Sequence, residues 1–238
     1  MSGHSKWSTI KRQKGAADQK RGAAFTKLAN AITIAVREGG GGDPNFNFRL
    51  RLAIEKAREA NMPKDNIQRS IDRGLGKGEG VTLENAVYEG FGPGGVAVIV
   101  ETITDNKTRT GSVLRLLFDR AGGNLGATGA VSYLFTRMGE IEVDKTDLTD
   151  EELLEKALNA DAVDTEDNLV YTHPEDLHEV KVKLEEDGVK VVSAQLVYRP
   201  NKETLIVVSE PEKLQTIHSF LEQVSDLDDV QEVYANLS

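Results

Sequence analysis

Basic residues gather at the start of the sequence, with a composition that suits contact with a polyanion. Asp18 is the only acid among the first 27 residues, and Trp7, the only tryptophan of the chain, lies there too. Ammonium and guanidinium groups neutralise phosphates, and an exposed indole offers a face on which a base can stack. The candidate nucleic-acid-binding residues of this segment are therefore Lys6, Trp7, Lys11, Arg12, Lys14, Lys20, Arg21 and Lys27.

The charge is divided unevenly along the chain. Residues 1–77 hold 16 Lys and Arg against seven Asp and Glu, a net charge of +9, whereas residues 78–238 carry −19. This division favours a basic region that binds a polyanion and an acidic body that keeps the protein in solution. Two alternatives stay open at this point. The two parts could neutralise each other across a domain contact, or the tail could be solvated without a partner.

Composition excludes several classes of protein. The chain of 238 residues has no cysteine, so it holds no disulfide and no cysteine-ligated zinc. No apolar run approaches the roughly 18 residues of a membrane span, and the N-terminus lacks the apolar stretch of a secretory signal. A basic, acid-poor N-terminus is also typical of a transit peptide, and composition alone leaves that alternative open.

Glycine-rich stretches give weak signals for nucleotide binding. Gly90, Gly92 and Gly95 match the spacing of a dinucleotide fingerprint, but they precede an apolar strand instead of following one. The stretch from Gly74 to Gly78 lacks the spacing of a phosphate-binding loop, and we interpret it as a hinge in which Lys77 could touch phosphate. We interpret the first stretch as a structural loop.

Residues that could carry catalysis are scattered. His173 and His178 are five apart, whereas a metal pair on one helix face needs a spacing of four, so we interpret the histidines as solvated. No serine stands in a nucleophile elbow, and the acid pairs lie on expected solvated helix faces. We therefore expect a protein that is not an enzyme, with no catalytic residue, no metal and no cofactor.

The basic third contains three expected helices. Apolar residues at helical spacing begin at Ala23 and stop at the glycines 39–42, and a second helix has its apolar stripe at Leu50, Ala53, Ile54 and Ala57. Its basic residues flank that stripe and extend the candidate interface: Arg49 and Lys56 on one side, Arg51 and Arg58 on the other. A third helix starts near Pro63. We expect residues 1–22 to be a flexible basic tail and 23–77 a helical bundle.

Strands and helices alternate over the acidic part. We expect strands at 96–100, 131–135, 139–143, 169–171, 189–198, 204–209 and 230–234, with helices between several of them. The helix over 107–121 should turn Val113, Leu116, Leu117 and Ala121 inward. The fold class is α+β, with mixed or antiparallel sheets. We expect a discontinuous domain, 78–135 and 204–238, that encloses an inserted α+β domain at 136–203.

Several motifs together resemble the YebC/PmpR family over essentially the whole chain. They are Gly3 to Trp7, Lys20 to Gly22, Phe25 to Leu28, the glycines 39–42, Arg49 to Ile54, Asn61 to Ile67, Tyr88 to Gly95, Gly122 to Gly126, and Asp228 to Tyr234. The resemblance is weaker over 140–200, where only the architecture is alike. The family resemblance implies three domains, a helical bundle and two α/β domains of which the last is inserted in the second. It also places the first family motif at Gly3, which argues against a presequence and favours a cytoplasmic bacterial protein.

The resemblance implies a function that uses the basic surface. Bacterial members are described as transcriptional regulators that bind DNA, whereas mitochondrial relatives resemble translational activators and some bacterial relatives are linked to relief of ribosome stalling. Our first hypothesis is a DNA-binding transcriptional regulator. The second is a translation factor that binds ribosomal RNA, because the sequence shows no helix-turn-helix reader and basic tails often fold on RNA. The third is a protein scaffold whose acidic domains bind a basic partner.

Overall fold

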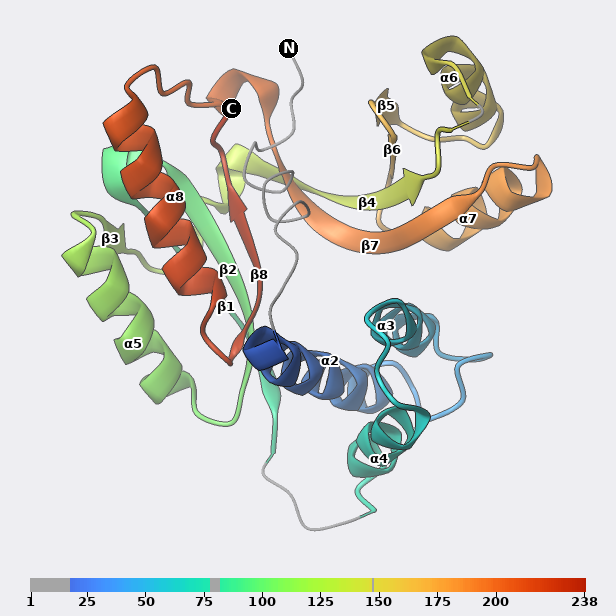
Figure 1. Cartoon of the computed structure of the whole chain (residues 1–238), viewed down its shortest axis with the longest axis horizontal. Coiled ribbons are helices and arrows are strands. Elements are labelled where there is room, and N and C mark those ends of the chain that lie inside the picture. Colours follow the sequence, from blue (N-terminus) through green and yellow to red (C-terminus); the bar gives the residue numbers. More distant parts are fainter. Residues whose placement is uncertain (1–17, 78–81, 147) are drawn as a thin grey trace.

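The protein has an α+β fold of three domains, a helical bundle and two domains built on antiparallel sheets (Figure 1). The structure, a computed structural model, describes residues 18–77, 82–146 and 148–238, and for residues 18–21 it describes the backbone only. Five of the predicted tail residues, Lys6 to Lys14, therefore lie outside the described residues. The division into three domains with one inserted in another confirms the expected fold class.

The bundle consists of α2 (Asp18–Glu38), α3 (Phe48–Glu59) and α4 (Lys64–Gly74). Its core buries Ile32 and Val36 of α2 against Leu50 and Ile54 of α3. The helices α2 and α4 approach closely at Gly74, where an added Cβ would lie 2.6 Å from the Val36 Cβ, so only glycine fits there. The helix α2 begins five residues earlier than expected, since Gly22 is tolerated inside a helix whose later turns are packed.

The first sheet has the strand order β3-β1-β2-β8. It takes β1 (Glu84–Phe91), β2 (Ala97–Thr104) and β3 (Asn124–Leu125) from before the second sheet and β8 (Val230–Ala235) from after it. The helices α5 (Lys107–Arg120) and α8 (Pro211–Ser225) cover one face (Figure 1). Phe118 of α5 meets Phe220 of α8 edge to face, with ring centroids 4.9 Å apart, and both rings are buried.

The second sheet has the order β5-β6-β4-β7. It consists of β4 (Phe135–Val143), β5 (Asp164–Glu166), β6 (Leu169–Thr172) and β7 (Val191–Pro200), and it packs against α6 (Asp150–Asn159) and α7 (Leu177–Glu186). The rings of Tyr198 of β7 and Tyr234 of β8 meet edge to face with centroids 5.4 Å apart, which joins the two sheets. We propose the domain boundaries expected from the sequence, because each sheet draws its strands from the corresponding ranges.

Some expected elements differ from the observed ones. Residues 204–209 are not a strand, since Ile206 makes only an isolated bridge to Leu237 after a short 3-10 turn at Lys202–Thr204. A second 3-10 turn, Ser132–Leu134, occupies most of the expected strand 131–135. The strand β1 was not expected at all. The interpretation of Gly90 to Gly95 as a structural loop holds in part, because β1 runs through Phe91 and a 3-10 turn at Pro93–Gly95 leads into β2.

Candidate nucleic-acid interface

Lys27 lies in the middle of α2 and reaches another domain. Its Nζ donates to the carbonyl oxygen of Ser225 at 2.6 Å. Ser225 ends α8, and the C-terminal carbonyls of a helix carry partial negative charge that favours a cation. This hydrogen bond therefore connects the bundle to the C-terminal end of α8. Lys20 and Arg21 lie in the first turn of α2, and only their backbone is described.

Arg51 is held between the bundle and the inserted domain. Its Nε and Nη2 donate to the carbonyl oxygens of Pro44 and Asn45 at 3.0 and 3.1 Å, and its Nη1 lies 3.3 Å from His178 Nε2. The His178 ring also packs on Phe48 at 4.9 Å. The expectation that the histidines are solvated is therefore wrong for His178, which tertiary packing places in a domain contact.

Lys56 points from α3 toward both sheets. Its Nζ lies 2.7 Å from Glu232 Oε1 of β8 and 3.3 Å from Gln195 Oε1 of β7. The charge of Glu232 raises the pKa of Lys56, against burial, which lowers it. The ammonium group is therefore kept charged inside a contact among all three domains.

Arg49 and Arg58 are the predicted cations of α3 that are exposed and make no described contact with another domain. Lys56, although it is paired with Glu232, also keeps 51% of its side-chain surface exposed. Arg49 Nη1 pairs with Glu38 Oε2 at 3.3 Å, and its side chain keeps 61% of its surface exposed. Arg58 is exposed near the end of the helix. Lys64, exposed at the first position of α4, follows across a short turn. From the sequence, Lys64 served only to mark the start of a helix. Because it follows Arg58 after a short turn, it could have been added to the basic surface.

An open pocket of about 680 Å³ lies among the three domains. Leu28, Leu52, Ile103 and Leu196 contribute apolar surface, and the ion pairs of Arg49, Lys56 and Arg137 lie around it. The contacts of Lys27, Arg51 and Lys56 thus join the basic bundle to the acidic body. The ion pair of Lys56 with Glu232 neutralises part of the uneven charge across a domain contact. Such neutralisation is one of the two alternatives that the sequence left open.

In the described part of the chain, no group of three or more His, Cys, Asp or Glu side chains could hold a metal ion. The pKa of Tyr88 is raised by burial, and its hydroxyl donates to the Lys107 carbonyl oxygen at 2.7 Å, which makes it a structural contact.

Two family models together match nearly the whole chain. The model described as the TACO1/YebC protein N-terminal domain matches residues 5–77, and the model described as the TACO1/YebC second and third domain matches residues 83–237. The chain belongs to the TACO1/YebC family. The resemblance identified from sequence motifs is therefore confirmed.

Relatives of this TACO1/YebC chain match it along its full length. A protein of Chloroflexus aurantiacus is 50% identical over 243 residues, which span 100% of this chain and 95% of the relative. A protein of Aquifex aeolicus is 47% identical over 240 residues, which span 99% of this chain and 95% of the relative. Both are named probable transcriptional regulatory proteins.

A solved structure has the same fold. The crystal structure of a conserved hypothetical protein, Aq1575 from Aquifex aeolicus, is similar with a TM-score of 0.86 and 46% sequence identity, and the match covers 95% of this chain and 93% of that chain. In the described residues, no helix is long and apolar enough to cross a membrane.

Proposed function

We propose that this protein is a non-enzymatic, cytoplasmic regulator that binds DNA and acts on transcription. The names of its full-length relatives support a regulatory role. The net charge of +9 on residues 1–77 carries the proposal that the partner is a nucleic acid.

The anchored cations and the exposed cations take different roles in this proposal. Lys27, Arg51 and Lys56 hold the bundle against the body, because each has a partner in another domain. Phosphate contact falls to the tail and to Arg49 and Arg58 of α3, which are exposed and make no described contact with another domain. The proposed residues are Lys6, Lys11, Arg12, Lys14, Lys20, Arg21, Arg49 and Arg58, with Trp7 stacking on a base.

The decisive experiment identifies the nucleic acid bound in cells. The protein is crosslinked in living cells and the attached nucleic acid is sequenced, in parallel with sedimentation of ribosomes. Enrichment of promoter DNA without co-migration on ribosomes is expected. Enrichment of ribosomal RNA would overturn the transcriptional proposal and support the translation hypothesis.

The tail is tested by its salt dependence in vitro. If about six phosphates are neutralised on duplex DNA, the logarithm of the affinity falls against the logarithm of salt with a slope of roughly −5. The double variant Lys11→Glu with Arg12→Glu should weaken binding and flatten that slope. An unchanged affinity and slope would remove the tail from the interface.

A further inference from the structure

The outer edge of β1 is open over half its length. The neighbouring strand β3 pairs only with Gly90 and Phe91, at the end of β1. On the other side, β1 pairs with β2 along all eight residues, without a bulge. The segment from Glu84 to Val87 therefore has no strand neighbour on its outer side among the described residues.

The backbone of this segment is directed outward at alternate residues. Gly126 N–H donates to the Glu89 carbonyl oxygen at 2.8 Å on the outer side, whereas Gly92 N–H donates to the Val96 carbonyl oxygen at 2.7 Å on the β2 side. Both polar groups of one strand residue point the same way, and the direction alternates along the strand. Val87 and Asn85 thus direct their N–H and C=O groups away from β2, where they can accept a further strand.

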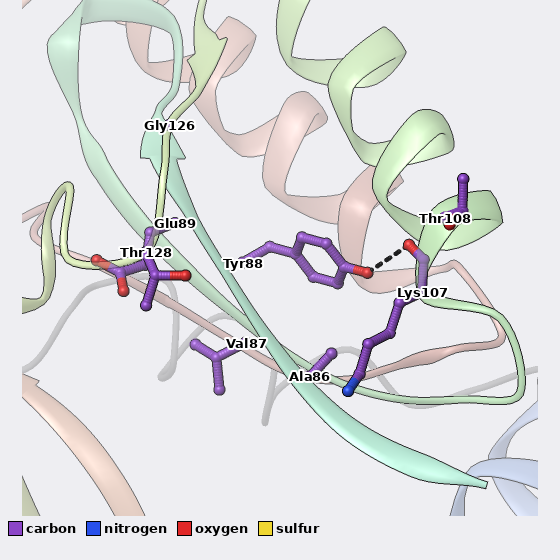
Figure 2. Close-up of a pocket in the computed structure, with 8 residues that line it drawn as sticks. All are labelled: Ala86, Val87, Tyr88, Glu89, Lys107, Thr108, Gly126 and Thr128. Carbon is purple, nitrogen blue, oxygen red and sulfur yellow. Dashed lines mark hydrogen bonds between the residues drawn. The ribbon is translucent and has the colours of Figure 1, made fainter.

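A groove of about 500 Å³ follows this edge (Figure 2). Val87, which is 40% exposed, lies on it, and Lys107 and Thr108 of α5 form its helical wall. The Tyr88 hydroxyl donates to the Lys107 carbonyl oxygen at 2.7 Å, which fixes this wall to the sheet (Figure 2). Gly126 and Thr128 also line the groove, so a segment that enters it meets defined surfaces.

The opposite wall is fixed by a buried carboxylate. Glu89, 5% exposed, accepts the backbone N–H groups of Gly129, Val131 and Ser132 at 2.8, 2.9 and 2.8 Å. These bonds hold the loop after β3 in place. A groove with two fixed walls loses little entropy when it is filled, which favours binding.

The helical end of the groove already holds a carboxylate. Lys107 Nζ lies 2.7 Å from Glu84 Oε2, and both side chains are 49% exposed, so the pair can exchange with a competing carboxylate. The first N–H groups of α5 have no acceptor within the helix. The Asn106 side chain accepts the N–H of Arg109, and the N–H groups of Lys107 and Thr108 remain for a ligand. Lys107 and these amides together favour a negative group at this end of β1.

We propose that the open edge of β1 docks an extended peptide segment that carries a carboxylate. The peptide would add to the first sheet as a strand antiparallel to β1, hydrogen-bonding to Val87 and Asn85. In that direction its C-terminal end lies beside Lys107, where its carboxylate takes the place of Glu84. The carboxylate is the C-terminus of the partner protein, because an antiparallel strand ends beside Lys107 and the first amides of α5.

The test uses the full chain and a defined probe, the peptide acetyl-STVTVE with a free C-terminus, followed by backbone amide resonances. Two further probes have the last residue changed to glutamine or the C-terminus amidated. The glutamine probe should keep the binding and the amidated probe should lose it, whereas the reverse would assign the carboxylate to a side chain and contradict the proposal. We expect saturable shifts centred on Asn85, Val87, Lys107 and Thr108. No shifts at millimolar peptide, or shifts centred elsewhere, would overturn the proposal.

Substitutions on the edge sharpen the test. Val87→Pro removes only an outward N–H and should weaken binding about five- to tenfold, whereas Val87→Thr keeps the N–H and should bind as the natural protein does. Glu84→Gln removes the competing carboxylate and should strengthen binding about two- to fivefold, while Lys107→Gln weakens it by a similar factor. If Val87→Pro does not fold, the opposite signs of the last two variants decide, and equal effects contradict the proposal.

A second copy of the chain is the other occupant that the open edge could accept. Sedimentation of the protein alone over a range of concentrations measures this directly. A dimer that Val87→Pro converts to a monomer would show that the edge pairs with itself and would overturn the peptide proposal. A monomer at all concentrations supports it.

Discussion

Lys56 and Glu232 are 176 residues apart in the chain, yet the ammonium nitrogen of one lies 2.7 Å from a carboxylate oxygen of the other. This pair joins the basic bundle to the last strand of the first sheet. The charge of Glu232 keeps the pKa of Lys56 above its ordinary value although burial opposes it. A cation that the sequence suggests for phosphate contact is thus engaged between domains.

The pair should contribute measurably but modestly to stability. Because both side chains keep part of their surface in water, we expect a coupling free energy of about 0.5–1 kcal/mol. Urea unfolding of Lys56→Gln, Glu232→Gln and the double variant measures it as a cycle. Additive effects in that cycle would show that the contact contributes nothing to holding the domains together.

Arg58 and Lys56 provide a matched pair for DNA binding. Both lie in the last turns of α3, but Arg58 faces solvent and Lys56 is engaged by Glu232. Arg58→Gln should reduce the salt slope of DNA binding by about one. Lys56→Gln should leave that slope unchanged. Fluorescence titrations at several salt concentrations check both, and a flatter slope in Lys56→Gln would return Lys56 to the interface.

Asn47 organises the link between α2 and α3 and should be costly to replace. It is 2% exposed, its Nδ2 donates to the carbonyl oxygens of Ala35 and Gly41 at 2.8 Å each, and its Oδ1 accepts the Leu50 N–H at 3.0 Å. Asn47→Ala should lower the free energy of unfolding by about 1–3 kcal/mol, because it removes a helix cap and takes one hydrogen bond each from the carbonyl oxygens of Ala35 and Gly41.

The variant Asn47→Asp separates these two contributions. Aspartate keeps the acceptor for Leu50 N–H but places an oxygen against the two carbonyls. Thermal unfolding should show it destabilised as well. Stability equal to that of the natural protein would mean that the cap alone matters.

Much of the fold could be predicted because local signals and tertiary packing agree. The glycines 39–42, Pro63 and Pro211 mark helix ends or starts that the structure contains. The strand β1 could not be predicted, since its two glutamates, Glu84 and Glu89, are five residues apart and lie on opposite faces, so no alternation shows which face is buried. Glu89 is buried because three backbone N–H groups from a distant loop satisfy it, and no local pattern encodes them.

The candidate site was predictable in composition but not in arrangement. The sequence places cations on both flanks of α3, and the structure contains them there. Which of them is engaged by another domain depends on Glu232 and His178, more than 100 residues away along the chain. Residue spacing within one helix cannot carry that information.

The helix α5 gives a direct test of which apolar face is buried. Sequence periodicity turns Val113, Leu116, Leu117 and Ala121 inward. The structure packs Leu117 and Ala121 against the core, but it buries Leu114 and Phe118 fully and leaves Val113 39% and Leu116 48% exposed. The helix has apolar residues on two faces, and packing on Phe220 of α8 selects one. Leu114→Ala should cost about 2–5 kcal/mol and Leu116→Ala less than about 0.5 kcal/mol in urea unfolding. A larger loss of stability for Leu116→Ala than for Leu114→Ala would show that the face expected from the sequence is the buried one.

Glu89 should make the stability of the first sheet depend on pH. Burial alone raises the pKa of this carboxyl group, but the N–H groups of Gly129, Val131 and Ser132 outweigh it and hold the pKa below its ordinary value. The fold therefore favours the ionised form. This stabilisation is complete above the pKa of the unfolded chain, about 4.3, and is lost as the pH falls through the lower pKa of the folded protein.

Glu89→Gln tests this dependence. Both oxygens of Glu89 accept backbone N–H groups, and in glutamine an NH2 group takes the place of one oxygen. At least one loop N–H group then faces another donor, so the variant should lower the free energy of unfolding by about 1–3 kcal/mol at neutral pH. The difference from the natural protein should shrink as the pH falls below about 5, because the unfolded chain binds a proton at this position first and the folded carboxylate only at lower pH. Urea unfolding at a series of pH values measures the difference, with Glu84→Gln on the exposed part of the same strand as the control. A difference that stays constant with pH would mean that Glu89 is not ionised in the folded protein.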